Sequence, residues 1–121
     1  MNESFALCAA SDAVLDHFDW GRLHWYASAA QHNAAGVTVG RCVLNPGCGN
    51  PIHLHPNCEE VLHVLTGVIE HYIEGRGWMP MNAGDTITIE ANIRHGARNV
   101  GVDEAHLLIC FSSANRQTIG E

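Results

Sequence analysis

Short β-rich runs separated by turn residues constrain the fold of this chain more than any other feature of its sequence. The turns contain Asn-Pro-Gly, Thr-Gly and Asn-Ala-Gly-Asp sequences, which favour chain reversal. No stretch has the pattern of a long amphipathic helix. About eight short strands at this spacing therefore predict an all-β sandwich or barrel. We expect them at Leu23–Ala27, Val37–Leu44, Ile52–His55, Glu60–Leu65, Val68–Glu74, Gly77–Met81, Thr86–Glu90 and His106–Ser112.

The first 20 residues differ because their pattern is loosely helical. Ser11 or Asp12 is suited to cap a short helix that continues through Ala13, Val14 and Leu15. We expect one domain over residues 1–121, with its core at about 37–112. The segment 1–30 is expected to pack on that core or to form a dimer arm.

The charge balance excludes several classes of partner. The chain has 6 Lys and Arg against 13 Asp and Glu, a formal net charge of −7. We therefore expect neither nucleic acid nor an anionic membrane surface as a partner. Charged residues make up 16% of the chain, below the roughly 25% usual in soluble domains, so we expect a homodimer to cover part of the surface. No segment has the ~18 consecutive apolar residues of a transmembrane helix.

The cysteines favour a reducing compartment. They number five and contain no Cys-x-x-Cys pair, so the sequence predicts neither a complete disulfide framework nor a zinc knuckle. Cys42 and Cys110 are expected to be small buried apolar side chains, whereas the roles of Cys48 and Cys58 stay open. The chain starts with acidic Glu3 instead of the basic residues of a signal peptide. We therefore expect a cytoplasmic location.

Two histidines one residue apart are the strongest indication of chemistry. Residues i and i+2 of a strand project from the same face, so His53 and His55 can present two imidazoles to one point. Glu60 follows shortly after, and His95 lies beyond a glycine-containing turn. Imidazole nitrogen and carboxylate oxygen are ligands that first-row divalent ions accept. The spacing predicts a metal site inside a β-barrel.

Strand parity extends this prediction to the neighbours of Glu60. If Glu60 faces the barrel interior, Leu62 and Val64 face it too, while Val61 and Leu65 point the other way. Both faces are largely apolar, and a strand that is apolar on both faces is usually buried on both. We expect the outer face to meet a second sheet or a partner chain.

Two longer motifs surround these candidate ligands. Residues 47–67 resemble the first motif of the cupin superfamily, G-x5-HxH-x(3,4)-E-x6-G, at every fixed position. The six residues between Glu60 and Gly67 favour Glu60 over Glu59 as the carboxylate ligand. Residues 84–99 are similar to the second motif, G-x5-P-x-G-x2-H-x3-N, at three of five fixed positions. Glu90 and Asn92 replace its proline and glycine, and asparagine can adopt the left-handed conformation of a glycine.

The resemblance implies the cupin double-stranded β-helix, a jelly-roll barrel, with four residues converging on one divalent transition-metal ion such as Fe, Mn, Ni or Zn. Those residues are His53, His55, Glu60 and His95. Small single-domain cupins include dioxygenases, isomerases and sugar-catabolic proteins. We therefore expect a metal-dependent enzyme of the dioxygenase or isomerase type, acting on a small polar, carboxylated or sugar-derived molecule. The alternative is a non-catalytic cupin that binds a sugar or small molecule in a regulatory role.

Four further residues are candidates for roles around the metal. Glu90 is interpreted as a base at the barrel mouth or as a solvated turn carboxylate. His106 shares parity with Leu108 and is interpreted as an interior acid or substrate donor, or as a rim histidine. Arg94 and Arg98 bracket His95, where either can clamp a carboxylate or form an exposed salt bridge.

The remaining aromatic and histidine residues are assigned to structure. Residues 20–26 place three aromatic residues and one arginine in seven positions, a composition suited to an interface or to a substrate platform. We favour the interface. His63 has the wrong parity relative to Glu60, and it is interpreted as structural together with His71.

Overall fold

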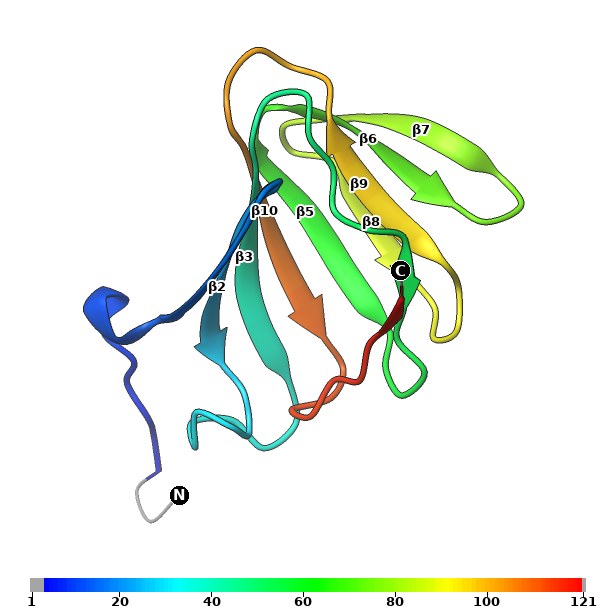
Figure 1. Cartoon of the computed structure of the whole chain (residues 1–121). Coiled ribbons are helices and arrows are strands. Elements are labelled where there is room, and N and C mark those ends of the chain that lie inside the picture. Colours follow the sequence, from blue (N-terminus) through cyan, green and yellow to red (C-terminus); the bar gives the residue numbers. More distant parts are fainter. Residues whose placement is uncertain (1–3, 121) are drawn as a thin grey trace.

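Two antiparallel sheets face each other in the computed structural model, which describes residues 4–120 (Figure 1). The six-stranded sheet has the order β1-β2-β3-β10-β5-β8, and the five-stranded sheet has the order β11-β4-β9-β6-β7. This confirms the predicted all-β double-stranded β-helix. The strands are β1 Val14–Phe18, β2 Gly21–Ala27, β3 Thr38–Leu44, β4 His53–Leu54, β5 Glu60–Thr66, β6 Val68–Ile73, β7 Gly77–Asn82, β8 Thr86–Ile89, β9 His95–Asn99, β10 Ala105–Phe111 and β11 Ile119–Gly120.

Strand β10 lies in the middle of the larger sheet, between β3 and β5. Its side chains alternate strictly between buried and half-buried positions, because successive residues of a strand point to opposite faces. Strand β5 alternates in the same way, with Glu60, Leu62 and Val64 buried. The predicted parity of these three residues is therefore confirmed.

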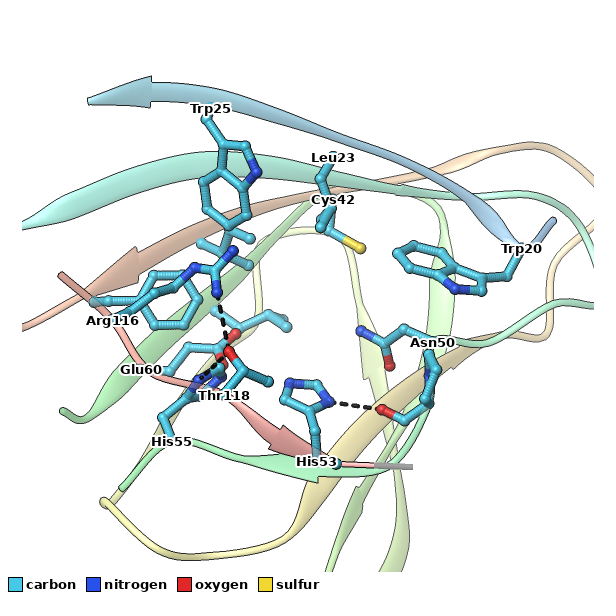
Figure 2. Close-up of a pocket in the computed structure, with 15 residues that line it drawn as sticks. Trp20, Leu23, Trp25, Cys42, Asn50, His53, His55, Glu60, Arg116 and Thr118 are labelled. Carbon is cyan, nitrogen blue, oxygen red and sulfur yellow. Dashed lines mark hydrogen bonds and ion pairs between the residues drawn. The ribbon is translucent and has the colours of Figure 1, made fainter. Parts of the chain in front are cut away.

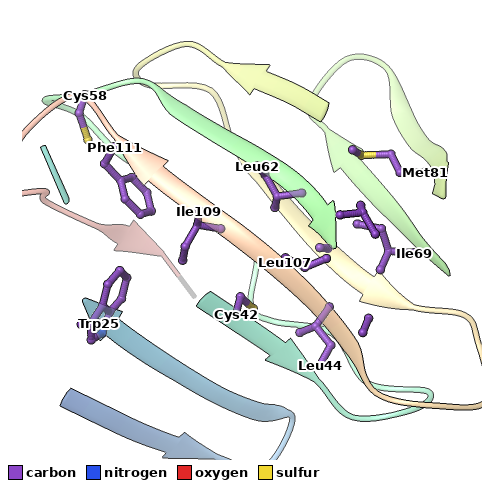
Figure 3. Close-up of a cluster of buried hydrophobic side chains, with 13 residues drawn as sticks. Trp25, Cys42, Leu44, Cys58, Leu62, Ile69, Met81, Leu107, Ile109 and Phe111 are labelled. Atoms are coloured by element: carbon purple, nitrogen blue, oxygen red, sulfur yellow. The ribbon is translucent and has the colours of Figure 1, made fainter. Parts of the chain in front are cut away.

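The inward-facing side chains form one hydrophobic cluster between the sheets (Figure 3). Leu44, Val64, Ile69 and Leu107 are fully buried in it. Burial of each such aliphatic side chain contributes roughly 1.5–3 kcal/mol relative to exposure. The cluster holds the two sheets together and thereby fixes the strands that carry the candidate ligands.

The N-terminal segment does not form the helix expected after Ser11 and Asp12. Only one turn of 3-10 helix forms, at Ala10–Asp12, and the chain continues as β1. Strand β1 pairs with β2, and the indole of Trp25 donates a hydrogen bond of 3.1 Å to Asp16. β-branched Val14 and aromatic Phe18 suit a strand. Because β2 offers an edge with which this segment can pair, it forms a strand and not a helix.

Two strands near the site were not predicted. Strand β9 begins at His95 and contains glycine, alanine and asparagine, which have low β propensity. It forms because β6 pairs with it along its whole length. Strand β11, at Ile119–Gly120, pairs with β4, so the C-terminal segment returns to the strand that carries His53.

Two turn positions explain the motif residues. Asn92, at the motif's second glycine, has φ of 69°, which confirms that asparagine can supply the left-handed conformation. Gly67 has φ of 100°, and a Cβ there would lie 2.9 Å from Ala105, so this turn requires glycine.

Asn99, the last fixed residue of the second motif, is buried, and its amide nitrogen donates to the carbonyls of Leu44 and Asp103 at 2.9 and 2.8 Å.

The outer face of β5 is only partly covered in the single chain. Val61 and His63 are half-buried, and Leu65 is exposed, so the expected second layer does not come from residues 4–120.

All five cysteines are free. Glu3, on which the signal-peptide argument rests, lies outside the described residues. Within those residues, we find no helix with the length and hydropathy required to cross a bilayer.

Candidate metal centre

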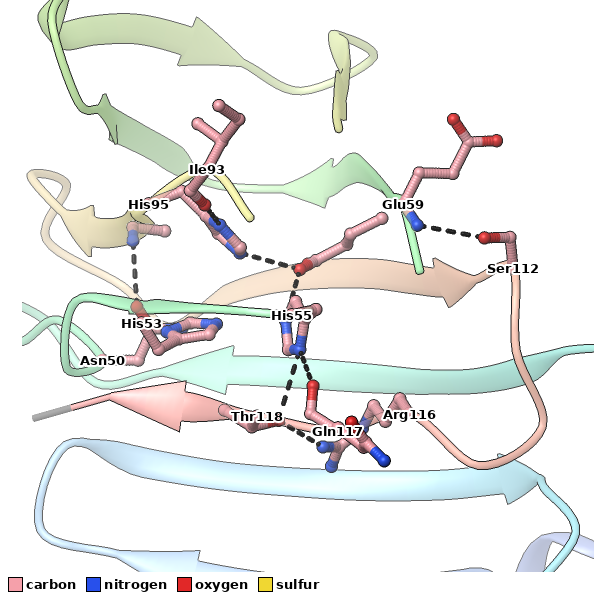
Figure 4. Close-up of polar contacts among 12 residues, drawn as sticks. Asn50, His53, His55, Glu59, Ile93, His95, Ser112, Arg116, Gln117 and Thr118 are labelled. Atoms are coloured by element: carbon pink, nitrogen blue, oxygen red, sulfur yellow. Dashed lines mark hydrogen bonds and ion pairs between the residues drawn. The ribbon is translucent and has the colours of Figure 1, made fainter. Parts of the chain in front are cut away.

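Four predicted ligands from three parts of the chain converge at one point inside the barrel, and Figure 4 labels the three histidines among them. His53 and His55 lie in and just after β4, Glu60 begins β5, and His95 begins β9. Pairing of β4 with β9 places His53 opposite His95. The candidate ligand atoms of the four residues all lie within 4.8 Å of one another.

Backbone carbonyls fix the orientation of all three imidazoles. The Nδ1 atoms of His53, His55 and His95 lie 2.6, 2.9 and 2.9 Å from the carbonyl oxygens of Pro51, Gln117 and Ile93. A carbonyl oxygen only accepts, so each Nδ1 carries the proton. Each Nε2 is then left to face the centre, an arrangement that orients histidine for metal binding.

Glu60 supplies the negative charge of the centre. Its Oε1 lies 2.9 Å from His95 Nε2 and 3.2 Å from His55 Nε2. Burial by itself raises the pKa of Glu60, but the two imidazoles outweigh burial and hold that pKa well below its usual range. Burial likewise lowers the pKa of His95, yet the Glu60 carboxylate reverses this and raises it overall. The arrangement favours a cation beside Glu60, either a proton or a metal ion.

The donor set fits a divalent first-row ion. His55 Nε2 is buried 3.2 Å from Glu60 Oε1 but forms no hydrogen bond among the described residues. Because the proton of His55 is on Nδ1, both of these atoms are acceptors, and a cation between them would satisfy both. Burial lowers the pKa of His53 to about 4, so this imidazole is neutral and able to coordinate at pH 7. An ion about 2.1 Å from each ligand separates opposite ligands by about 4.2 Å. Small side-chain shifts therefore suffice.

A cavity of about 370 Å³ opens beside the candidate ligands (Figure 2). His53, His55 and Glu60 line its floor, whereas apolar side chains form much of its wall. The apolar and aromatic lining residues are Trp20, Leu23, Trp25, Leu62, Ile109 and Phe111. The site can therefore hold a ligand against an ion and shield it from water.

The predicted interior position of His106 is wrong. His106 lies on the outer face of β10, where its Nδ1 is 3.4 Å from Arg41 Nη1 and its Nε2 is 3.5 Å from Glu104. Its parity is opposite to that of the buried residues Leu107 and Ile109. Both alternating sets of β10 are apolar, Leu107 with Ile109 and Leu108 with Cys110, so the sequence pattern did not show which set faces inward.

Glu90 and Arg94 lie outside the cavity lining. Glu90 is exposed beside a separate shallow hollow that Asn57 and Glu59 also line. The backbone N–H of Arg94 donates to Glu74 at 2.9 Å. Arg98 binds Glu70 through Nε and Nη2 at 2.9 and 2.7 Å, which confirms the salt-bridge interpretation for that residue.

Sequence reasoning missed several groups in or next to the site. Arg116, Thr118 and Asn50 line the cavity, and no motif spacing marks the first two. His71 is fully buried with both ring nitrogens lacking a partner in the described chain, and its ring stacks on His95 at 5.8 Å. Its alternation with Ile69 along β6 was the available signal that it faces inward.

The aromatic segment at residues 20–26 lines the cavity with one face. Trp20, Leu23 and Trp25 belong to the wall, while Arg22 Nη1 forms an exposed ion pair of 3.0 Å with Glu104. Three of the seven residues therefore lie where the platform interpretation requires them. The interface interpretation applies only to its outward-facing residues.

The fold and the site together define a metal-binding jelly-roll protein. A family model described as "Cupin domain" matches residues 40–111. The chain belongs to the cupin family.

Two named relatives match this chain over part of their own length. "Germin-like protein 3-8" of Oryza sativa subsp. japonica is 33% identical over 85 residues, which cover 67% of this chain and 38% of that protein. "Oxalate oxidase 1" of Hordeum vulgare is 32% identical over 90 residues, or 69% of this chain and 45% of that protein. The chain therefore spans less than half the length of both relatives.

Solved structures show the same fold. The Lactobacillus farciminis oxalate decarboxylase formate complex superposes with a TM-score of 0.83 at 20% identity, covering 91% of this chain and 34% of that one. A recombinant oxalate oxidase in complex with glycolate gives a TM-score of 0.77 at 26% identity, covering 87% and 57%.

Proposed function

We propose that this cupin is a metal-dependent oxidoreductase or isomerase that acts on a small carboxylated molecule. The observation that carries the proposal is the meeting of three oriented imidazoles and one carboxylate at the floor of a cavity. The names of the oxalate oxidase and oxalate decarboxylase relatives support carboxylates as the first substrates to test. Iron, manganese, nickel and zinc all suit this donor set.

Different residues of the chain would hold the ion, orient its ligands and exclude water from such a site. When bound, a divalent ion supplies a Lewis acid and, if it is redox-active, an electron donor. His53, His55, Glu60 and His95 would hold the ion, with Glu60 neutralising part of its charge. The carbonyls that bind each Nδ1 keep the imidazoles oriented. The apolar wall excludes water and strengthens electrostatic interactions at the floor.

One observation favours the alternative of a non-catalytic binding protein. Among the described cavity-lining residues, no carboxylate or imidazole is present besides the candidate ligands themselves. A reaction that needs a separate carboxylate or imidazole as its acid or base would lack one there. A binding module would instead use the same cavity to hold a small acid or sugar.

Metal loading followed by turnover assays separates the two functions. Protein freed of metal is loaded with Mn, Fe, Ni or Zn and tested with oxalate, glycolate, larger monocarboxylic acids and uronates for oxygen uptake, carbon dioxide release and isomerisation. We expect turnover with at least one ion, lost in His95→Ala and kept in His63→Ala. His63 is the control because it lies on the outer face, 2.7 Å from Thr86 Oγ1.

Thermal stabilisation supplies the contrasting result. A ligand at about 100 times its Kd adds ~2.7 kcal/mol to the free energy of unfolding. Stabilisation without product for every ion at full occupancy would favour the binding module over the enzyme.

We also propose that the chain forms a homodimer through its N-terminal strand. All five residues of β1 are exposed, and Val14, Leu15 and Phe18 expose 47%, 44% and 46% of their surface. An exposed apolar edge strand favours pairing with another chain. Light scattering should give twice the chain mass for the parent and for Val102→Glu, and the single mass for Leu15→Glu. A monomeric parent contradicts the proposal.

A cytoplasmic location is proposed on the five free cysteines, since disulfides are rare in reducing compartments. Fractionation of the native cell tests it. Recovery outside the cytoplasm would contradict it.

A further inference from the structure

Arg116 reaches the metal cavity from the segment that connects β10 to β11 (Figure 2). Its guanidinium carbon lies 4.1 Å from the centroid of the Trp25 ring and 5.3 Å from that of Phe111. Nη1 donates a hydrogen bond of 2.9 Å to Thr118 Oγ1. The aromatic rings and the hydroxyl therefore hold the planar cation in one orientation at the cavity wall.

Among the carboxylates of residues 4–120, none forms an ion pair with Arg116 at contact distance, although the charges of Glu60 and Asp16 act on its guanidinium from farther away. By contrast, Arg22 forms an ion pair with Glu104, and Arg98 forms one with Glu70. Glu60, at the cavity floor, already contacts two imidazoles. A half-buried guanidinium retains donors for an incoming anion, and its fork geometry matches a carboxylate.

Arg98 shows what the same arrangement looks like when an acid is present. Its guanidinium carbon lies 3.8 Å from the centroid of Trp78, and Glu70 accepts from two of its nitrogens. Both arginines stack on a tryptophan, but only Arg98 has a carboxylate of the described chain beside it. In the cavity, a ligand carboxylate would take the place that Glu70 takes on the surface.

The size and lining of the cavity restrict the rest of the ligand. A volume of about 370 Å³ lies within the range of roughly 300–1,000 Å³ that holds drug-sized ligands. Trp20, Leu23, Leu62 and Ile109 give the wall an apolar surface. A compact diacid would leave much of that surface without contacts, whereas an aromatic or branched aliphatic group would cover it.

We propose that Arg116, oriented by Trp25 and Thr118, binds the carboxylate of a monocarboxylic acid whose apolar body packs in the cavity. The inference rests on the proposed function, because it names the substrate class of that same site. Arg116 would determine specificity for the acid over its neutral analogues. Thr118 acts as a positioning residue through its hydrogen bond to the guanidinium.

Titration calorimetry on the zinc-loaded protein tests the proposal with phenylacetate, phenylacetamide and acetate as probes. We expect phenylacetate to bind at least tenfold more tightly than either other probe. Arg116→Gln should lose at least tenfold in phenylacetate affinity and change phenylacetamide affinity by less than twofold. Arg98→Gln, the matched control with a stacked but acid-paired arginine, should bind phenylacetate as the parent does.

Two further variants keep the test valid if Arg116→Gln does not fold. Arg116→Lys keeps the charge but loses the planar fork, so we expect about threefold to tenfold weaker phenylacetate binding. Thr118→Val should weaken it by about threefold. Equal binding of phenylacetate and phenylacetamide by the parent, or parent-like phenylacetate affinity in the Arg116 variants, overturns the proposal. Because calorimetry needs no turnover, absence of catalysis with every metal would overturn the enzyme proposal separately.

Discussion

The inner and outer faces of the same sheets carry the same residue types in different surroundings. Inside, three imidazoles donate Nδ1–H to backbone carbonyls, and their other ring nitrogens gather with the Glu60 carboxylate at one centre. Outside, His63 contacts Thr86, and His106 lies beside Arg41 and Glu104. This difference shows what makes a histidine a candidate ligand here. A backbone carbonyl accepts from its Nδ1 and fixes the ring, and its other nitrogen lies close to the other candidate ligand atoms. Position on a strand is not enough.

The largest expected contrast between the faces concerns metal affinity. His95→Ala removes a direct candidate ligand, so we expect at least ~100-fold weaker metal binding, since changes to the partners that support ligands already cost about 10–100-fold. His63→Ala should change affinity by less than twofold. Competition with a chelator of known affinity measures both. Equal losses in the two variants would contradict the assignment of the inner face.

Truncation of neighbouring leucines on β10 compares the packing of the two faces. Leu107 is fully buried, whereas Leu108 is half-buried on the outer face. Leu107→Ala should lower the free energy of unfolding by about 2–5 kcal/mol through lost contacts and a cavity. Leu108→Ala should lower it by about 1 kcal/mol. Urea unfolding of the metal-free protein measures both values, and similar losses would show that the outer face is equally well packed.

Buried histidine also predicts how the stability of the metal-free protein depends on pH. Burial, followed by the charge of His95, lowers the pKa of His71 from 6.5 to about 4. The unfolded chain therefore binds more protons between these values, and the His71 contribution to stability is lost as pH falls from about 6.5 to 4. That contribution is up to about 3 kcal/mol, since each pKa unit is worth about 1.36 kcal/mol.

His95 works in the opposite direction, because its raised pKa gives stability at low pH that is lost as pH rises through the folded value. Replacement of His71 by Phe tests the His71 term by itself. Urea unfolding between pH 4 and 7 should show a flatter dependence in His71→Phe than in the parent. An unchanged slope would mean that the pKa of His71 is not lowered in the folded protein.

The smallest expected effect belongs to the outer ion pair. Arg98 and Glu70 lie near the surface, where such pairs contribute about 0–1 kcal/mol and weaken with salt. Glu70→Gln should therefore lower the free energy of unfolding by less than about 1 kcal/mol, with the difference vanishing in 1 M salt. A larger loss of unfolding free energy that does not depend on salt would show that this ion pair behaves as a buried one.

The sequence predicted the interior of the site better than its rim. The period-two pattern was enough to place His53 and His55 on one strand face, because that depends on local strand geometry. The resemblance to the two cupin motifs added Glu60 and His95. Strand β9 could not be predicted from its own weak β propensity, since pairing with β6 creates it. Arg116 enters the cavity only because the chain reverses after β10 and β11 returns to β4. Such long-range pairing leaves no local periodicity to read.

The most direct test of the central claim is the location of a metal ion by anomalous diffraction from crystals of the metal-loaded protein. We predict a single strong peak about 2.0–2.2 Å from the Nε2 atoms of the three inner histidines and from a carboxylate oxygen of Glu60. A peak on the outer face beside His106 or His63, or no peak at full metal loading, would contradict the account.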